Sequence, residues 1–354
     1  MIEAAAPLDF YGYDRDALGA LLHERCGFPK YRAAQIFDWV YRKGVCDCRQ
    51  MSNISRVWRE YLEQSFIFPR AQVLSRLTSR DGTRKYLLEV SPKRVVESVL
   101  IPQAQRNTLC ISSQVGCAMG CGFCRTASLG FKENLSSGDI IREVLAVRDD
   151  PVSGGCEFDN IVFMGMGEPL HNYAAVVTAI RILLDDHAFH VGPRKITVSS
   201  AGLLPALEQF VGEGLDVSLA LSLNATTDEV RSRIMPINRR YNIAGLLDFV
   251  RRCPLKPRRK ITIEYVLFRG LNDSNEDLRR LIGLMQGLRV KVNLIAYNEN
   301  EGLPFFAPTE GVIDNWYRSL NRAGVQTTIR LSKGSDIAAA CGQLAAQKAG
   351  CDAH

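Results

Sequence analysis

Three closely spaced cysteines have the pattern of ligands to an inorganic centre. The stretch from residue 110 to 124 reads CISSQVGCAMGCGFC, in which Cys117, Cys121 and Cys124 are spaced C-x3-C-x2-C among glycines. Glycine lets the backbone turn where a Cβ atom would clash, so three thiolates on one short loop can converge on one centre. Iron–sulfur clusters are usually held by four cysteines. With three, one iron would stay open to another ligand, and an open position is typical of catalytic rather than structural metal centres.

The same cysteines are compatible with one alternative, a structural zinc ion completed by a distant cysteine or histidine, because thiolates bind zinc as well as iron–sulfur clusters. The chain has 11 cysteines in 354 residues. With no charged, apolar, cleavable signal at the N-terminus, this number favours metal or redox chemistry in a reducing compartment over a disulfide scaffold. No apolar run reaches the length of a membrane-spanning helix. We therefore expect a soluble, cytoplasmic protein with no membrane partner, and we expect it to be a monomer.

The periodicity of apolar residues divides the chain into three parts. Residues 1–70 have apolar residues at helical spacing and form a small helical unit. Residues 71–106 are β-rich, and Asp81-Gly82 between two strand candidates is a hairpin signal. Residues 107–354 hold the cysteine loop and, after it, β-branched, mostly apolar runs at 160–166, 195–200, 216–223, 260–268, 291–297 and 327–331.

Helical patterns such as SGDIIREVLAVRDD and SNEDLRRLIGLMQGL lie between these runs. Strands that alternate with helices predict a parallel sheet covered by helices, here with six or seven βα units. Because that is too few for a closed eight-stranded barrel, we expect an α/β fold with a partial (βα)6-type barrel, open on one side. The handedness of the crossovers places the C-terminal ends of all strands at one mouth, where functional residues should gather.

Polar or glycine residues end several of the predicted strands and would meet at that mouth. The run Gly165-Met166-Gly167-Glu168-Pro169 closes the first strand, and Glu168 there can accept hydrogen bonds from an ammonium or a hydroxyl group. The other rim candidates are Ser199, Ser222, Leu223, Asn224 and Asn298. Each one alone is more typical of an ordinary turn or cap, so the prediction of a binding site depends on their recurrence at one rim.

Two groups of basic residues are candidates for contacts with phosphates. The net charge of +6 is modest, but RRCPLKPRRK at 251–260 concentrates it, and Arg231, Arg233, Arg239 and Arg240 lie just upstream. Clustered guanidinium groups suit a phosphate backbone through bidentate hydrogen bonds and counterion release. A solvated face without a partner is an equally good interpretation of either group taken alone.

The longer stretch CISSQVGCAMGCGFCRTASLGF resembles the RlmN/Cfr family of RNA methyltransferases in the radical S-adenosylmethionine (SAM) superfamily, and the resemblance extends from YRAAQIFDWVYRKG to AAACGQL. It implies that Cys117, Cys121 and Cys124 hold one 4Fe–4S cluster, with SAM at the open iron. Gly167 and Glu168 match the family's GGEP motif, which binds the amino group of SAM. The positions that match contacts to the rest of SAM are Ser199, Ser222, Leu223, Asn224 (where many relatives have histidine) and Asn298.

Three further residues gain a role only through the resemblance. Taken alone, Cys110 and Cys341 are most simply buried structural cysteines. The resemblance makes Cys341 the methyl-carrying cysteine, Cys110 its partner and Glu97 a proton acceptor. In the implied reaction one SAM methylates Cys341, and a second SAM is cleaved to a 5′-deoxyadenosyl radical that takes a hydrogen from this methyl group. The methylene radical adds to the base, and attack by Cys110 on Cys341 releases methylated RNA and leaves a disulfide.

The resemblance implies that the substrate is C2 of an adenosine in 23S rRNA, at the peptidyl transferase centre, and in tRNA, with flavodoxin or ferredoxin as electron donor. Residues 1–70 would then be a helix-hairpin-helix-like RNA-binding domain, although a packing module fits their sequence equally well. Methylation at C8 of adenosine, the Cfr reaction, uses the same cysteines and is not separated by these motifs. A non-enzymatic zinc/RNA-binding protein is a second class of function, but it leaves Cys110, Cys341 and the glycine–glutamate rim unexplained.

Overall fold

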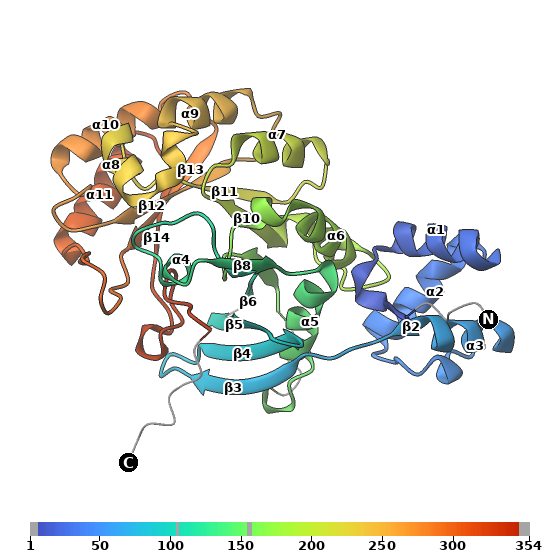
Figure 1. The fold of residues 1–354 in the computed structure, drawn as a ribbon. Coiled ribbons are helices and arrows are strands. Elements are labelled where there is room, and N and C mark those ends of the chain that lie inside the picture. The colour runs from blue at the N-terminus through green and yellow to red at the C-terminus, as the bar shows by residue number, and fades with distance from the viewer. Residues whose placement is uncertain (1–5, 104–105, 154–157, 347–354) are drawn as a thin grey trace, which may run out of the picture.

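The computed structural model describes residues 6–103, 106–153 and 158–346. Cys156 and Cys351 lie outside the described residues. The described chain forms a helical unit at the N-terminal end and one large α/β unit (Figure 1). No described helix is both long and apolar enough to span a membrane.

The N-terminal unit consists of three short helices packed around aromatic side chains. They are α1 (Arg15–Cys26), α2 (Ala33–Phe37) and α3 (Arg56–Ser65). The Asp14 carboxylate accepts a hydrogen bond from the Ala17 N–H (2.8 Å) and so caps α1. Phe10 packs against Phe37 and Tyr41, with ring centroids 5.8 Å apart in both pairs. A short parallel pair, β1 (Leu8–Asp9) with β2 (Phe66–Ile67), joins the two ends of the unit.

The large unit is built on a ten-stranded sheet with the order β14-β13-β12-β11-β10-β9-β6-β5-β4-β3. Seven neighbouring strands, from β6 to β14, run parallel, while β3, β4 and β5 continue the sheet beyond β6 in antiparallel fashion. The strands are β3 (Gln72–Thr78), β4 (Arg84–Ser91), β5 (Arg94–Gln103), β6 (Arg106–Ile111), β9 (Asn160–Phe163), β10 (Ile196–Ser200), β11 (Ser218–Ser222), β12 (Ile261–Leu267), β13 (Val290–Ala296) and β14 (Thr327–Arg330).

Helices connect each pair of successive parallel strands, as the alternating pattern predicted (Figure 1). The connections contain α5 (Ser137–Arg148), α6 (Tyr173–Leu184), α7 (Leu204–Gly212), α8 (Asp228–Ile234) with α9 (Ile243–Arg252), α10 (Asn275–Met285) and α11 (Glu310–Arg322). Among the described strands β14 pairs only with β13, so the sheet does not close. Six βα units and a final strand therefore form a partial barrel, which confirms the predicted fold.

Side chains alternate along each strand, so one face of the sheet packs on the hydrophobic core and the other face lines the interior of the barrel. In β9, Ile161 and Phe163 are almost fully buried, whereas Val162 between them faces the interior of the barrel. The hairpin predicted at Asp81-Gly82 is also present, since Ser79 and Thr83 close the turn between β3 and β4 (N···O 2.8 Å) and Gly82 has a φ of 85°. Arg142 of α5 forms an ion pair with Asp9 (2.5 Å), which joins the N-terminal unit to the barrel.

Candidate active site

The three cysteines lie on the loop that follows β6, where a small hairpin shapes the chain. Strand β7 (Gln114–Gly116) pairs with β8 (Phe131–Asn134), and the loop between them contains the short helix α4 (Arg125–Ser128). Gly116 and Gly120 have φ of 76° and 65°, and a Cβ at Gly116 would collide with the Gly130 carbonyl. Glycine is therefore required at position 116 of the cysteine loop, as the glycine-rich sequence suggested.

One cavity collects most of the residues singled out from the sequence. It has a volume of about 170 Å³ and is lined by all three loop cysteines together with the strand-end residues Gly167, Glu168, Ser199, Ser222, Asn224 and Asn298, and by Cys341. Leu223 is the exception among the rim candidates, because its side chain belongs to the hydrophobic core. Cys110 and Glu97 are buried and do not line the cavity.

The loop cysteines are partly buried, and their environment disfavours the charged thiolate form. Burial raises the pKa of Cys117 to about 12, and it also raises the pKa values of Cys121 and Cys124. Neighbouring cysteines raise the pKa of Cys121 further, because like charges in one cavity repel each other. Thiolates at these positions therefore need a cationic partner.

Glu168 is held at the end of β9 by backbone groups of its neighbours. Its Oε2 accepts a hydrogen bond from the Ala201 N–H (2.8 Å), and its Oε1 accepts one from the Leu170 N–H (3.2 Å). Each carboxylate oxygen has a second lone pair for a ligand. Burial raises the pKa of Glu168 to about 7. Gly167 precedes it with a φ of 95°, and a Cβ there would lie 2.5 Å from the Gln114 Cβ.

Arg231 corrects one expectation from the sequence, which grouped it with exposed basic residues. It is fully buried, and its guanidinium donates to the carbonyls of Ala201, Ser222 and Leu223 at 2.8, 3.0 and 3.0 Å. The ends of β10 and β11 are thereby tied together at the wall of the cavity. Charge count alone could not reveal this, because a buried arginine bound to carbonyls and an exposed one have the same sequence signal. Arg233, Arg239 and Arg240 remain exposed.

Asn224 combines a backbone and a side-chain role. Its φ is 56°, a conformation that asparagine adopts more readily than most residues. The side-chain Oδ1 accepts a hydrogen bond from the Val266 N–H (2.9 Å) and Nδ2 contacts the Met235 sulfur (3.3 Å). Asn224 therefore shapes the cavity wall between β11 and β12 as well as lining it.

Cys341 reaches the cavity on a C-terminal segment, residues 331–346, that contains neither an α-helix nor a strand. On the cavity side, Asn298 Nδ2 donates to the Cys341 carbonyl (3.1 Å) and the Arg125 N–H donates to the Gly342 carbonyl (2.7 Å). Thr126 Oγ1 donates to the Leu344 carbonyl (2.7 Å). The cysteine loop and the end of β13 therefore both hold the segment that carries Cys341.

The β3–β5 extension holds the same segment from the other side. Asp336 accepts hydrogen bonds from Ser79 Oγ (2.6 Å) and from the Arg80 N–H (3.2 Å). Lys85 donates to the Ala338 carbonyl (3.2 Å) and forms an ion pair with Glu97 (3.2 Å). The second oxygen of Glu97 accepts a hydrogen bond from the Ala345 N–H (2.8 Å). Glu97 therefore binds the Cys341 segment directly, which sequence alone did not indicate.

Cys110 lies in β6, where it is 5% exposed and pairs with Val99 and Val162 of the adjacent strands. Burial first and the neighbouring Cys341 second raise the pKa of its thiol, and Arg330 opposes them, so that the pKa is about 12. The structure thus brings Cys110 close to Cys341 although 231 residues separate them in sequence.

Arg330 is a residue of the site that sequence reasoning missed. It ends β14, lines the cavity with Cys341, and forms an ion pair with Glu264 of β12 (3.4 Å). Its pKa is raised, first by Cys341 and then by Glu264 and Cys110, although burial opposes this. The strand TTIRL gave a signal only in its alternation, which places Arg330 on the interior face with Thr328.

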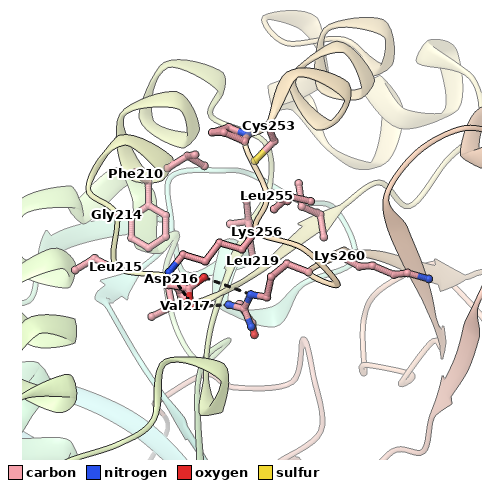
Figure 2. Close-up of a pocket in the computed structure, with 15 residues that line it drawn as sticks. Phe210, Gly214, Leu215, Asp216, Val217, Leu219, Cys253, Leu255, Lys256 and Lys260 are labelled. Carbon is pink, nitrogen blue, oxygen red and sulfur yellow. Dashed lines mark hydrogen bonds and ion pairs between the residues drawn. The ribbon is translucent and has the colours of Figure 1, made fainter.

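The basic segment 251–260 lies away from this cavity, at the N-terminal end of β12 (Figure 2). Lys256 and Arg259 both pair with Asp216 there, at 3.2 and 3.5 Å. Arg252 pairs with Asp248 (2.8 Å) and Glu208 (3.2 Å). Local acidic partners therefore neutralise much of the charge that suggested a phosphate-binding patch.

Comparisons with known proteins identify the class and then the family. Residues 111–282 match the family model of the radical SAM superfamily, and residues 8–67 match the ribosomal RNA large subunit methyltransferase N-terminal domain. A solved radical SAM methyltransferase from Sphaerobacter thermophilus superposes with a TM-score of 0.88 at 38% identity, covering 96% of this chain and 100% of that chain. The fold and site therefore define a radical SAM enzyme.

Curated relatives identify the family within the radical SAM enzymes. The dual-specificity RNA methyltransferase RlmN of Geobacter sulfurreducens is 48% identical over 95% of this chain and 92% of its own length. RlmN 2 of Myxococcus xanthus is 45% identical over 97% of this chain and 93% of its own. The chain belongs to the RlmN family of radical SAM RNA methyltransferases. Membership of the superfamily implies a 4Fe–4S cluster and SAM as cofactors.

Proposed function

We propose that this enzyme methylates C2 of an adenosine in 23S rRNA, at the peptidyl transferase centre, and in tRNA. The observation that carries the proposal is the single cavity shared by the three loop cysteines, the glycine–glutamate end of β9 and Cys341. The match of the N-terminal unit to a ribosomal RNA methyltransferase domain supports an RNA substrate, and the relatives named for dual specificity support two kinds of RNA. The N-terminal unit then contributes to RNA binding.

The residues present fit the implied cofactors. Cys117, Cys121 and Cys124 line one cavity and are the residues that would hold the cluster. Glu168 binds the amino group of SAM, and Ser199, Ser222, Leu223, Asn224 and Asn298 shape the rest of the SAM site. Leu223 contributes through its backbone, since its side chain is in the core.

When bound, the cofactors supply a methyl group and a 5′-deoxyadenosyl radical, with two SAM molecules used per turnover and a flavodoxin or ferredoxin as electron donor. Cys341 carries the methyl group on its sulfur, and the methylene carbon derived from it bonds to C2 of the adenine. The base is then joined covalently to Cys341. Asn298 and Arg125 keep this cysteine in place through the backbone of residues 341 and 342.

Release requires two further events on the chain's own residues. The proton at C2 leaves and the unpaired electron of the adduct leaves with it, to the one-electron acceptor that the cluster would supply. Cys110 Sγ attacks Cys341 Sγ, so that a disulfide forms and the sulfur–carbon bond breaks; its electron pair goes to the methylene carbon, which takes up a proton and becomes the methyl group. Arg330 favours the thiolate form of Cys110, which burial otherwise opposes. Glu97 is the proton acceptor in this scheme. Each of its oxygens has one partner, Lys85 or the Ala345 N–H, and keeps a second lone pair that can take the proton.

The regiochemistry is tested by the product. Reconstituted enzyme with SAM and a reductant should convert adenosine in 23S rRNA fragments and in tRNA to 2-methyladenosine, measured by mass spectrometry of digested nucleosides. Detection of 8-methyladenosine instead would place the methylation at C8 of the same base. The absence of any methylated adenosine from active-cluster enzyme would refute the proposed function.

The role of Glu168 predicts a pH dependence of SAM affinity. Burial raises its pKa to about 7, and only the ionised carboxylate can pair with an ammonium. The ionised fraction falls as pH decreases through this pKa, so the affinity for SAM should drop roughly fivefold between pH 7 and pH 6. Equilibrium dialysis with labelled SAM measures this. Glu168→Gln should bind weakly at both pH values, and an equal pH dependence in this variant would exclude Glu168 as its source.

The role of Cys110 predicts a stalled intermediate. Cys110→Ala should still load the methyl group on Cys341 and bond to the base, because Cys110 acts last. It should then accumulate a protein–RNA species that nuclease trimming leaves on Cys341, which peptide mapping locates. Cys253→Ala is the matched control, since this partly buried cysteine lines the separate cavity in Figure 2. Normal turnover by Cys110→Ala would mean that Cys110 is only a packing residue.

A further inference from the structure

The basic group upstream of residues 251–260 has no role in the site described so far. Of its four arginines, Arg231 is buried in the cavity wall, but Arg233, Arg239 and Arg240 are exposed. The described residues supply none of these three with an ion-pair partner. They therefore differ from the segment 251–260, where local acidic residues neutralise much of the charge.

The three exposed arginines lie on a turn that packs against the cysteine loop (Figure 1). They belong to α8, to the 3₁₀ turn η8 (Pro236–Arg239) that follows it, and to the residue after that turn. The Gly122 N–H of the loop donates to the Ile234 carbonyl (2.9 Å). A Cβ atom at Gly120 would lie 3.6 Å from the ring of Pro236. The arginines are therefore close in the chain to residues that contact the loop directly.

The cysteine loop has one side toward the cavity and the other toward solvent. Its three cysteines line the cavity together with Met119 and Phe123. The residues that alternate with them, Ala118, Gly120 and Gly122, are exposed. The layer between the cavity and the surface is thus the loop itself, with small residues on its outer side. A cluster held by these cysteines would be near this surface.

Apolar side chains accompany the arginines at the outer side of the loop. Phe306 is 57% exposed, and Pro236 is exposed as well. A Cβ atom at Gly122 would lie 3.8 Å from the ring of Phe305. The N–H of a further exposed arginine, Arg269, donates to the Phe306 carbonyl (3.0 Å). Aromatic residues and arginine, with charge at the rim, are typical of a surface that binds another protein.

Positive charge predominates on this turn. Its helix does contain Asp228 and Glu229, but both are in the first turn of α8, one turn before Arg233. The Asp228 carboxylate accepts a hydrogen bond from the Ile243 N–H (2.9 Å). Within the described structure Glu229 forms no ion pair with Arg233. The exposed guanidinium groups therefore remain available to attract an acidic partner.

The proposed function, on which this inference rests, needs one electron from outside for each radical that is generated. A reduced carrier loses this electron to the cluster, and the electron then breaks the sulfur–carbon bond of SAM to give methionine and the 5′-deoxyadenosyl radical. Because electron transfer between proteins slows steeply with distance, the carrier has to bind where the cluster would be near the surface.

We propose that this surface binds the electron donor, a small acidic protein that carries a flavin or an iron–sulfur centre. The donor surface consists of Arg233, Arg239, Arg240 and Phe306 around the outer side of the cysteine loop. Electron-transfer contacts are typically small, below about 1,200 Å² in total, and complementary charge speeds their formation. A few exposed arginines around an apolar centre suit such a short-lived complex.

RNA is the other acidic partner that arginines could attract, but two observations favour a protein. The exposed Phe306 and Pro236 provide apolar area that a phosphate backbone does not cover. The cysteine loop also lies between the donor surface and the cavity that contains Cys341. RNA bound here would have the loop between its bases and the sulfur that must react with them.

Charge reversal tests the donor surface by binding. Arg239→Glu/Arg240→Glu should weaken the binding of purified flavodoxin and of purified ferredoxin to the cluster-containing enzyme roughly tenfold or more at low ionic strength. The difference should shrink as salt is added, because salt screens exposed charges. Surface plasmon resonance measures both affinities.

Arg318→Glu/Arg322→Glu is the matched control. It makes the same change of charge at two exposed arginines of α11, for which the described residues supply no ion-pair partner. These arginines are in the half of α11 that leads to the N-terminal end of β14, so they are at the opposite end of the barrel from the cysteine loop. The control should bind both donors like the wild type.

The choice of reductant separates donor binding from the chemistry. At limiting flavodoxin or ferredoxin, SAM cleavage by Arg239→Glu/Arg240→Glu should fall by about the same factor as donor affinity. With excess dithionite, a small reductant that needs no docking surface, cleavage should equal that of the wild type and the control. The dithionite rate also shows that the variant is folded and holds its cluster. Phe306→Asp should behave in the same way, because it puts a negative charge in the apolar centre of the donor surface.

Each outcome decides between the possibilities. Equal donor affinity in Arg239→Glu/Arg240→Glu and in the control would overturn the inference, and so would a loss of RNA affinity with donor affinity unchanged, which would make this an RNA-binding surface. If Arg239→Glu/Arg240→Glu fails to fold, Phe306→Asp decides alone. If the wild-type enzyme binds the donor and cleaves SAM but forms no methylated adenosine, the proposed function fails while the donor surface stands.

Discussion

The position of Cys341 depends on hydrogen bonds rather than on secondary structure of its own. The segment that carries it is held between the cysteine loop on one side and the β3–β5 extension on the other, through partners such as Arg125, Asn298, Lys85 and Glu97. Each hydrogen bond contributes only about 1 kcal/mol, and those to charged groups somewhat more. Because several act together, they hold the Cys341 segment, which has no α-helix or strand of its own, at the wall of the cavity. The chemistry proposed for the site requires that placement.

The antiparallel extension therefore has two effects. Lys85 and Glu97, from β4 and β5, bind the Cys341 segment, while Ile101, Pro102 and Gln103 at the end of β5 line the interior of the barrel. A partial barrel alone would be open beside β6, since the described part of β14 pairs only with β13. The extension continues the sheet beyond β6 and encloses the interior on that side. Changes in β4 or β5 should consequently affect both the segment that carries Cys341 and the interior of the barrel.

Features that depend on local pattern could be predicted from the sequence. The strands, the helices between them and the hairpin at Asp81-Gly82 follow from periodicity and turn chemistry, and Gly116 and Gly120 do have the left-handed conformations that the loop suggested. Features set by tertiary contacts could not be predicted. Arg231 has the sequence signal of an exposed cation, but it is buried among carbonyls. Likewise, nothing in VVESVLIP indicates that Glu97 binds a backbone N–H that is 248 residues away.

The placement of Cys341 beside Cys110 is tested most directly by asking whether the two cysteines can form a disulfide in the folded enzyme. Anaerobically prepared protein with its cluster intact would be treated with a mild thiol oxidant, alkylated, and mapped by peptide mass spectrometry without reduction. The account predicts one disulfide-linked pair of peptides containing Cys110 and Cys341, which reduction separates. Free alkylation of both cysteines, or linkage of Cys341 to another cysteine with Cys110 unmodified, would contradict the placement of Cys341 beside Cys110.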